Sequence, residues 1–222
     1  MIERILAEAD TMESSGEFDP SKANAHFKII CSSVGLKVLL PKIFHRLQSE
    51  APGIVLEIEQ HFHGVASLLL GGKSDLALVF NKIEENGIYS HPRILLDTPI
   101  CVMDPNNPLK NKQLTLNDLS EARHVEAQMW PGWRPYYTIE AERLGATIDT
   151  VAAVSDATYI PIFIQGTNLI SGMPSRLADS FTENIAKARF PFELEIAMSM
   201  YWSAASNRSP INSWLRQVCI EE

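Results

Sequence analysis

Residues 27–53 constrain the fold of this chain more than any other segment. An alternating strand pattern is followed by a polar turn at Ser32 and Ser33 and by an apolar stripe over residues 36–47. Apolar residues at steps of three and four indicate an amphipathic helix. Pro41 lacks a backbone donor, so we expect it in the first turns of this helix or where the regular helix begins. A second strand pattern at 54–59 completes a predicted parallel βαβ unit.

The same alternation continues along the chain. Glycines are found where the predicted helices end, and prolines where several of them begin. Thr115 and Asp118 form a capping-box pattern that predicts the start of a helix. Alternating strands and helices predict an α/β fold with two similar lobes. Further strands are expected at 75–80, 93–97, 99–103, 124–128, 151–154, 168–172 and 194–202, and further helices at 65–70, 135–144, 156–165, 210–219 and from Pro174.

Composition narrows the possible functions. The 222 residues carry 19 basic and 27 acidic side chains, a net charge of −8. Binding to nucleic-acid phosphates depends on clustered positive charge, so this balance argues against DNA binding by this chain alone. The three cysteines are far apart and odd in number, which predicts reduced thiols in a cytoplasmic protein.

The first residues resemble no targeting signal. Charged side chains interrupt the apolar positions of residues 2–12, which recur at helical or heptad-like spacing. A surface helix packed on its own domain and the end of a longer helix that pairs with a partner chain both fit this spacing. No apolar run is long enough to predict a membrane span.

Several motifs together resemble the effector-binding domain of LysR-type transcriptional regulators, nearest the nodulation-regulator and aromatic-catabolism branch. They cover nearly the whole chain in the family's order: residues 27–53, 71–78, 101–109, 114–119, 166–170, 173–178 and 214–216. The resemblance implies two Rossmann-like lobes of the type 2 periplasmic-binding-protein kind, with a ligand cleft between them. Residues 18–98 and 199–222 would form lobe I, 99–198 lobe II, and 1–17 the end of a linker helix.

The resemblance also implies partners. Family members carry an N-terminal winged helix-turn-helix, for which this chain has no room, so DNA would be bound only through that absent segment. We therefore expect the chain to be an isolated effector domain that needs no cofactor or metal. It would bind a small aromatic acid or phenol and form a homodimer or homotetramer, with residues 36–47 and 54–59 of lobe I pairing antiparallel.

Lobe I residues that follow strands are candidates for effector binding, because ligands of open α/β sheets lie at the carboxyl ends of strands. Ser32 and Ser33 carry hydroxyls suited to a carboxylate or phenolate, although simple helix capping is the alternative. Tyr201 is a candidate cover for an aromatic ring or a packing residue. The predicted lobe I and hinge contacts are Ser32, Ser33, Val34, Phe80, Asn81, Cys101 and Tyr201.

Lobe II candidates lie at the ends of two predicted strands. His124, Glu126 and Gln128 alternate with apolar residues and should share one face, with Gln128 best placed at the strand end. His124 alone is more often a packing histidine than a ligand. Capping is also the alternative for the helix opened by residues 155–158. The predicted lobe II contacts are His124, Gln128, Ser155, Asp156 and Thr158.

Other functions have weaker signals. No nucleophile elbow, P-loop or dinucleotide fingerprint occurs, so an enzyme on the same fold is not favoured. His61 and His63 share a strand face but lack an evident third metal ligand. Cys31 and Cys101 would make a thiol sensor only with resolving partners, and buried inert thiols are the better expectation. A free-standing solute-binding protein should carry a secretory signal. The upstream reading frame would separate these alternatives.

Overall fold

The computed structural model describes residues 18–60, 63–129, 131–181 and 184–222. The chain divides into two compact units, which we call the first lobe and the second lobe. The first lobe runs to Leu95 and resumes over Ala197–Glu222, and the second lobe is Leu96–Ile196. The expected N-terminal helix lies outside the described residues. Within them, no helix has both the length and the apolar character needed to cross a membrane.

The first lobe is built on a mixed five-stranded sheet with the order β2-β1-β3-β10-β4. The central strand β1 pairs in parallel with both β2 and β3, which confirms the predicted βαβ unit, and β10 joins β3 antiparallel. The strands are β1 (Ala25–Cys31), β2 (Ile54–Glu59), β3 (Leu76–Val79), β4 (Ile88–Asp97) and β10 (Ile196–Ser203).

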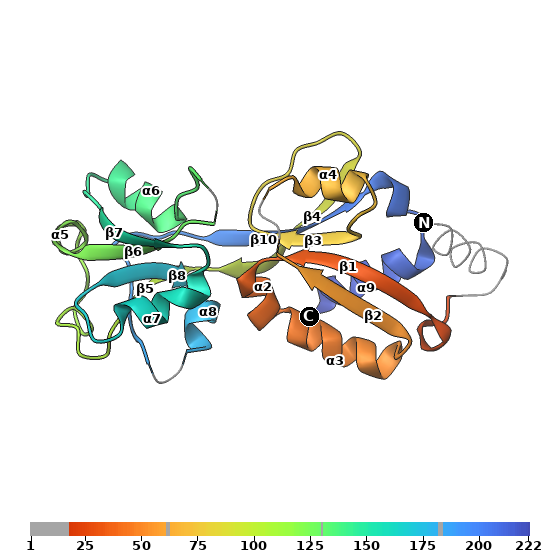
Figure 1. The fold of residues 1–222 in the computed structure, drawn as a ribbon, viewed down its shortest axis with the longest axis horizontal. Coiled ribbons are helices and arrows are strands. Elements are labelled where there is room, and N and C mark those ends of the chain that lie inside the picture. Colours follow the sequence, from red (N-terminus) through yellow and green to blue (C-terminus); the bar gives the residue numbers. More distant parts are fainter. Residues whose placement is uncertain (1–17, 61–62, 130, 182–183) are drawn as a thin grey trace. The chain divides into compact units, whose positions relative to one another are not determined.

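Helices cover both faces of this sheet (Figure 1). Pro41 lies in the first turn of α3, and Leu39 separates α3 from the short α2, so the proline marks the start of the regular helix as predicted. Short 3-10 turns η1 (Pro20–Lys22) and η3 (Ala204–Ser206) join the elements. The helices are α2 (Ser33–Val38), α3 (Leu40–Glu50), α4 (Val65–Leu70) and α9 (Pro210–Glu221).

The two faces of the first sheet have separate apolar cores. On one face, Ile30, Ala77 and Tyr201 pack against Val65 and Leu69 of α4. The other face packs against α3 and α9, which an ion pair of 2.6 Å between Arg46 and Glu221 joins at the surface. All four residues of β3 are buried, as expected for a strand covered on both faces.

The second lobe is built on another mixed five-stranded sheet, with the order β7-β6-β8-β5-β9. Strand β6 pairs in parallel with β7 and β8, and β5 runs antiparallel to β8 and β9. The short β9 was not predicted, because three residues are too few to show alternation. The strands are β5 (Pro99–Met103), β6 (Arg123–Ala127), β7 (Asp149–Val154), β8 (Ile170–Pro174) and β9 (Ala186–Ala188).

The helices of the second lobe again lie on both sides of the sheet (Figure 1). Helix α5 starts at the predicted capping box of Thr115 and Asp118. The single helix predicted for 156–165 is instead a 3-10 turn followed by α7, because Pro161 starts a new helical segment. The elements are α5 (Leu116–Glu121), α6 (Tyr136–Arg143), η2 (Ala157–Tyr159), α7 (Ile160–Ile164) and α8 (Ser175–Asp179).

An aromatic stack fills the core beneath α6. Tyr137 stacks on Phe190 with ring centroids 5.0 Å apart, and Phe190 stacks on Phe192 at 5.3 Å. Gly172 of β8 lies directly under the Tyr137 ring, where a Cβ atom would come within 2.3 Å of a ring carbon. Only glycine therefore allows the ring to approach the sheet this closely.

Candidate functional site

The first-lobe candidates meet at one edge of the sheet. Ser32 follows β1 and Phe80 follows β3, and these strands are parallel neighbours, so their carboxyl ends lie side by side. The Ser32 backbone N–H donates to the Leu78 carbonyl oxygen at 3.3 Å and joins the two strand ends. Phe80 and Asn81 are half-buried at this edge. Folding therefore brings together the polar turn and the residues after β3.

The two serines have different local roles. Ser32 is the N-cap of α2, and its hydroxyl oxygen accepts a weak hydrogen bond from the Gly35 N–H at 3.4 Å. Ser33 is the first residue of the helix, and it is buried together with Val34. Ser32 is therefore a helix-capping residue, which was the alternative interpretation of the two serines, whereas the Ser33 hydroxyl is not part of the cap.

The second-lobe candidates also meet at a strand edge. Gln128 follows β6 and Ser155 follows β7, and the Gln128 N–H donates to the Val154 carbonyl oxygen at 2.7 Å. Both side chains are exposed. The register of the parallel pair β6 and β7 therefore places the two polar side chains at the same edge of the sheet.

Asp156 combines capping with an open acceptor. Its Oδ1 accepts hydrogen bonds from the Thr158 N–H at 2.8 Å and from the Thr158 hydroxyl at 2.7 Å. The other carboxylate oxygen, Oδ2, is buried and has no hydrogen-bond partner among the described residues. A buried acceptor without a donor is costly, so this oxygen is a position where a donor from a ligand or water would be stabilising.

His124 is placed away from this edge. It is fully buried near the amino end of β6, where its Nε2 donates to the Leu119 carbonyl oxygen at 2.8 Å and its ring stacks near Tyr137. Burial disfavours the charged ring and lowers the pKa of His124. It is an interior packing histidine, and we do not include it in the proposed site.

Cys101 and Tyr201 are likewise interior residues. Cys101 is fully buried in the core of the second lobe, and burial raises the pKa of its thiol to about 12. The Tyr201 hydroxyl accepts a hydrogen bond from the Ile83 N–H at 3.3 Å while its ring packs in the core beneath α4. Neither side chain is among the exposed groups at the two strand edges, so neither is part of the proposed site.

Sequence reasoning missed the loop that follows β6. Trp133 and Tyr136 lie in and just after this loop, with ring centroids 6.4 Å apart at 77°. Glu126, one residue before the end of β6, is buried and accepts a 2.5 Å hydrogen bond from the Thr138 hydroxyl. The aromatic run over 130–137 was the available signal, since such a run beside a predicted strand end is unusual for a solvated loop.

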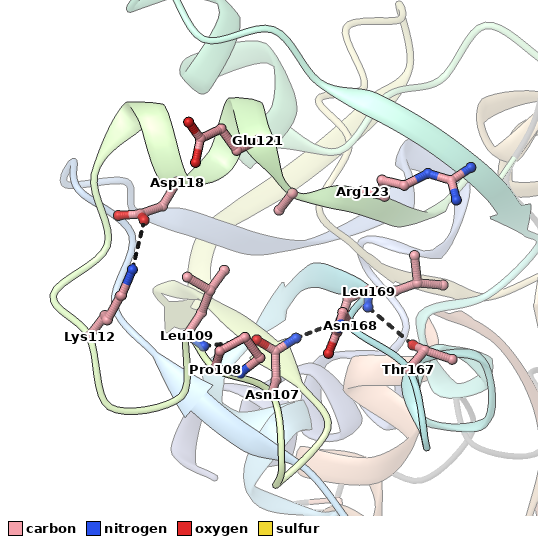
Figure 2. A pocket seen from close by; sticks show the side chains of 11 residues that line it. Asn107, Pro108, Leu109, Lys112, Asp118, Glu121, Arg123, Thr167, Asn168 and Leu169 are labelled. Carbon is pink, nitrogen blue, oxygen red and sulfur yellow. Dashed lines mark hydrogen bonds and ion pairs between the residues drawn. The ribbon is translucent and has the colours of Figure 1, made fainter.

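A hollow of about 570 Å³ lies elsewhere in the second lobe (Figure 2). It is found at the amino ends of β6 and β8, lined by Ala122 and Leu169 among others, and contains none of the predicted site residues. Lys112 pairs with Asp118 across 3.5 Å at its rim, and the Asn107 amide donates to the Leu169 carbonyl oxygen at 3.5 Å. Its charged side chains are of both signs and indicate no particular ligand.

Metal and thiol chemistry find no support in the described part of the chain. No group of three histidine, cysteine or acidic side chains suited to a metal occurs there, and His61 lies outside the described residues. Cys31, Cys101 and Cys219 are all buried free thiols. Burial raises the pKa of each, so the reactive thiolate is disfavoured.

Comparisons with known proteins agree on one family. The family model described as the LysR substrate binding domain matches residues 21–222. Nodulation protein D 2 of Sinorhizobium fredii is 28% identical over 211 residues, covering 92% of this chain and 67% of that protein. The HTH-type transcriptional activator NahR of Pseudomonas putida is 23% identical over 216 residues, covering 96% and 72%. The chain thus spans about two thirds of the length of such relatives.

Solved structures show the same fold. The regulatory domain of MexT, a transcriptional activator in Pseudomonas aeruginosa, superposes with a TM-score of 0.79 at 24% identity, covering 90% of this chain and 98% of that one. Full-length CbnR complexed with its target DNA superposes with a TM-score of 0.75 at 16% identity, covering 99% and 78%. The two mixed sheets with helices on both faces are therefore those of such regulatory domains.

Proposed function

We propose a function from one established premise: the chain belongs to the LysR substrate-binding domain family. It is the effector-binding domain of a LysR-type regulator, and the relatives that it matches are transcriptional regulators, not enzymes. The resemblance and the fold predicted from the sequence are thereby confirmed. The activity of the whole protein is proposed here, because the chain spans only part of its relatives.

The proposed site takes a small effector that contacts the carboxyl edges of both sheets. Ser33 and Asn81 would contribute from the first lobe, and Gln128, Ser155 and Thr158 from the second. One observation carries this proposal: in each lobe, polar residues that are distant in sequence follow neighbouring parallel strands at one sheet edge. Ligands of α/β sheets bind at such edges.

The effector is proposed to be aromatic, with a hydroxyl or carboxylate group. Phe80 is half-buried at the first-lobe edge, where its ring can contact an effector ring. The Ser33 hydroxyl can donate to an oxygen of the ligand. A ligand that contacts both lobes binds open and closed arrangements unequally, and only such a difference shifts their populations. The shift would then reposition the DNA-binding segments of the whole regulator.

Self-association is proposed through two exposed apolar patches. The first-lobe patch consists of Phe44 on α3 and of Ile58 on β2, which is an edge strand. The second-lobe patch consists of Tyr159, Ile162 and Phe163, and the Ile162 side chain is 71% exposed. Large exposed apolar groups of this kind mark interaction surfaces.

In a two-fold dimer each copy presents the same surface to its partner, so association through either patch would cover that patch on both copies. Association into dimers or tetramers, DNA contact through a segment outside this chain, and a cytoplasmic location are all part of the proposal. The net charge of −8 supports the expectation that this chain alone does not bind a promoter fragment at physiological salt.

A two-step experiment tests the effector proposal. Thermal-shift screening with aromatic acids, phenols and flavonoid-like compounds identifies ligands that stabilise the chain. Titration calorimetry of the best ligand against Ser33→Ala and Ser155→Trp then locates the site. Weakened binding by both folded variants supports the proposed edges, and wild-type affinity in both would overturn them.

A further inference from the structure

The hollow at the amino ends of β6 and β8 is separate from the proposed effector edge. Arg123 is the first residue of β6 and lines the hollow, whereas Gln128 follows the last residue of the same strand. These two positions are roughly 16 Å apart along the strand, because each residue advances a strand by about 3.3 Å. The volume of about 570 Å³ is that of a small-molecule site. A ligand in the hollow would therefore bind apart from the effector.

Two loops form one wall of the hollow, and hydrogen bonds hold them together. The buried Asp104 carboxylate accepts the Asn106 N–H at 2.7 Å from one loop and the Gly166 N–H at 2.6 Å from the other. The side-chain oxygen of Asn107, which is also buried, accepts the Leu109 N–H at 2.9 Å. These bonds fix the wall before any ligand binds, so little ordering of the chain opposes binding.

The inner surface of the hollow is apolar. Leu109, Ala122 and Leu169 line it and are half-buried, and the first two also pack against the second-lobe core. In Figure 2, Leu109 and Leu169 lie on one side of the hollow, and Glu121 and Arg123 lie on the other. The apolar part of a ligand would remove these leucine side chains from water, which favours binding.

The charged side chains around the hollow differ in whether they are paired. Lys112 pairs with Asp118, and the Arg123 Nε lies 3.3 Å from the carboxylate of Asp149. Glu121 is exposed and has no ion-pair or hydrogen-bond partner among the residues that the structure describes. The signs of these charges alone select no ligand, but their pairing does. The charge that is left for a ligand to neutralise is negative.

We propose that this hollow is a second small-molecule site, and that it binds a primary amine with an apolar body. The ammonium group pairs with the Glu121 carboxylate, and the apolar body contacts Leu109 and Leu169. The exposed Asn168 side chain also lines the hollow, and its amide oxygen can accept a further ammonium hydrogen. A carboxylic acid of the same shape would meet the unpaired Glu121 and be repelled.

Three matched probes test the site and its preference. Nuclear magnetic resonance titration of the ¹⁵N-labelled chain at low salt compares 2-phenylethylamine, 2-phenylethanol and 3-phenylpropionate, which share one ring and differ in charge. We expect the amine to bind about two- to fivefold more tightly than the alcohol, and the acid to bind least tightly. The shifted amide signals should be those of Leu109, Ala122 and Leu169. Another order of affinity, no binding of the amine, or shifts that gather elsewhere would overturn the inference.

Variants assign the preference to Glu121. Glu121→Gln should lower the affinity for the amine to that for the alcohol. Glu193→Gln removes the same charge from another exposed residue of the second lobe, outside the hollow, and should leave the preference unchanged. Leu169→Ala keeps the backbone hydrogen bonds of this residue and should weaken the amine and the alcohol alike, by about three- to tenfold. A preference that survives Glu121→Gln, or that Glu193→Gln removes, would contradict the assignment.

The same variants separate this site from the proposed effector site. Ser33→Ala and Ser155→Trp change the carboxyl edges of the sheets and should leave the binding of 2-phenylethylamine unchanged. Conversely, Glu121→Gln should leave unchanged the binding of a ligand found by the thermal-shift screen of aromatic acids and phenols. If both serine variants weaken amine binding while Glu121→Gln does not, the amine binds at the effector edges and the second site is wrong.

Discussion

The Thr138 hydroxyl donates a 2.5 Å hydrogen bond to the Glu126 carboxylate, and both residues are buried in the second lobe. This contact joins the first turn of α6 to the carboxyl end of β6. It also satisfies one oxygen of a carboxylate that has little contact with solvent. It also determines where the aromatic loop between the two elements is held. The pair therefore holds α6 against the strand whose end carries Gln128.

Replacing Thr138 by Val should destabilise the protein by about 1–3 kcal/mol, because the isosteric side chain leaves the buried Glu126 oxygen without its donor. Urea unfolding followed by circular dichroism measures the loss. Thr138→Ser is the matched control, since it retains the hydroxyl and should recover most of the difference. A Val variant as stable as wild type would show that the hydrogen bond contributes nothing.

Ser33→Ala should weaken effector binding by about 1–3 kcal/mol, roughly ten- to a hundredfold, because a buried hydrogen bond to the ligand is lost. The melting temperature should stay near that of wild type, since Ser32 is the capping residue. Ser32→Ala is the contrasting variant and should lower stability by about 0.5–2 kcal/mol through loss of the cap. Calorimetric binding and thermal melts on both proteins distinguish the two roles.

Gly172→Ala should destabilise the second lobe by about 1–3 kcal/mol, because the added methyl group would overlap the Tyr137 ring. A double variant in which Tyr137 is also replaced by Leu tests the cause. The Leu side chain leaves room for the methyl group, so the effect of Gly172→Ala should be smaller in that background. Identical effects in the two backgrounds would exclude the overlap as the origin.

Acidification should reduce stability through His124. Burial lowers the pKa of His124 in the folded state below its ordinary value of 6.5, so the unfolded chain binds the proton more readily. The contribution of the neutral ring is therefore fully present above about pH 6.5 and is lost as the pH falls below that value. Unfolding free energies across this range should fall less steeply for His124→Gln. An unchanged slope would rule out His124 as the source.

Ile162→Asp should dissociate dimers of the chain, because it places a charge in the exposed second-lobe patch. Sedimentation velocity at about tens of micromolar should then show a monomer, whereas the wild type should sediment as a dimer or tetramer. Leu70→Asp, at an exposed apolar residue of α4 outside both patches, should leave association unchanged. A monomeric wild type would contradict the proposed self-association.

Local sequence patterns predicted most of the helices and strands, because the residues that indicate each element lie within a few positions of one another. The four buried residues of β3 form a continuous apolar run, the Thr115 and Asp118 pair starts α5, and Pro41 marks the start of α3. The strand ends that carry Ser33 and Gln128 also follow from these patterns, since each end lies where an apolar run gives way to polar residues. Short elements such as β9 lack enough residues for a periodic signal.

Only the tertiary structure decided which side chains at these positions are buried. The period of two places His124, Glu126 and Gln128 on one face of β6. The residues that cover this face belong to α5, which precedes the strand in the sequence, and to α6, which follows it. His124 thus contacts the Leu119 carbonyl oxygen, whereas Gln128 follows the last residue of β6 and is exposed. Tyr201 similarly bonds to the backbone of Ile83, 118 positions away. Burial depends on contacts between distant segments, and no local pattern contains them.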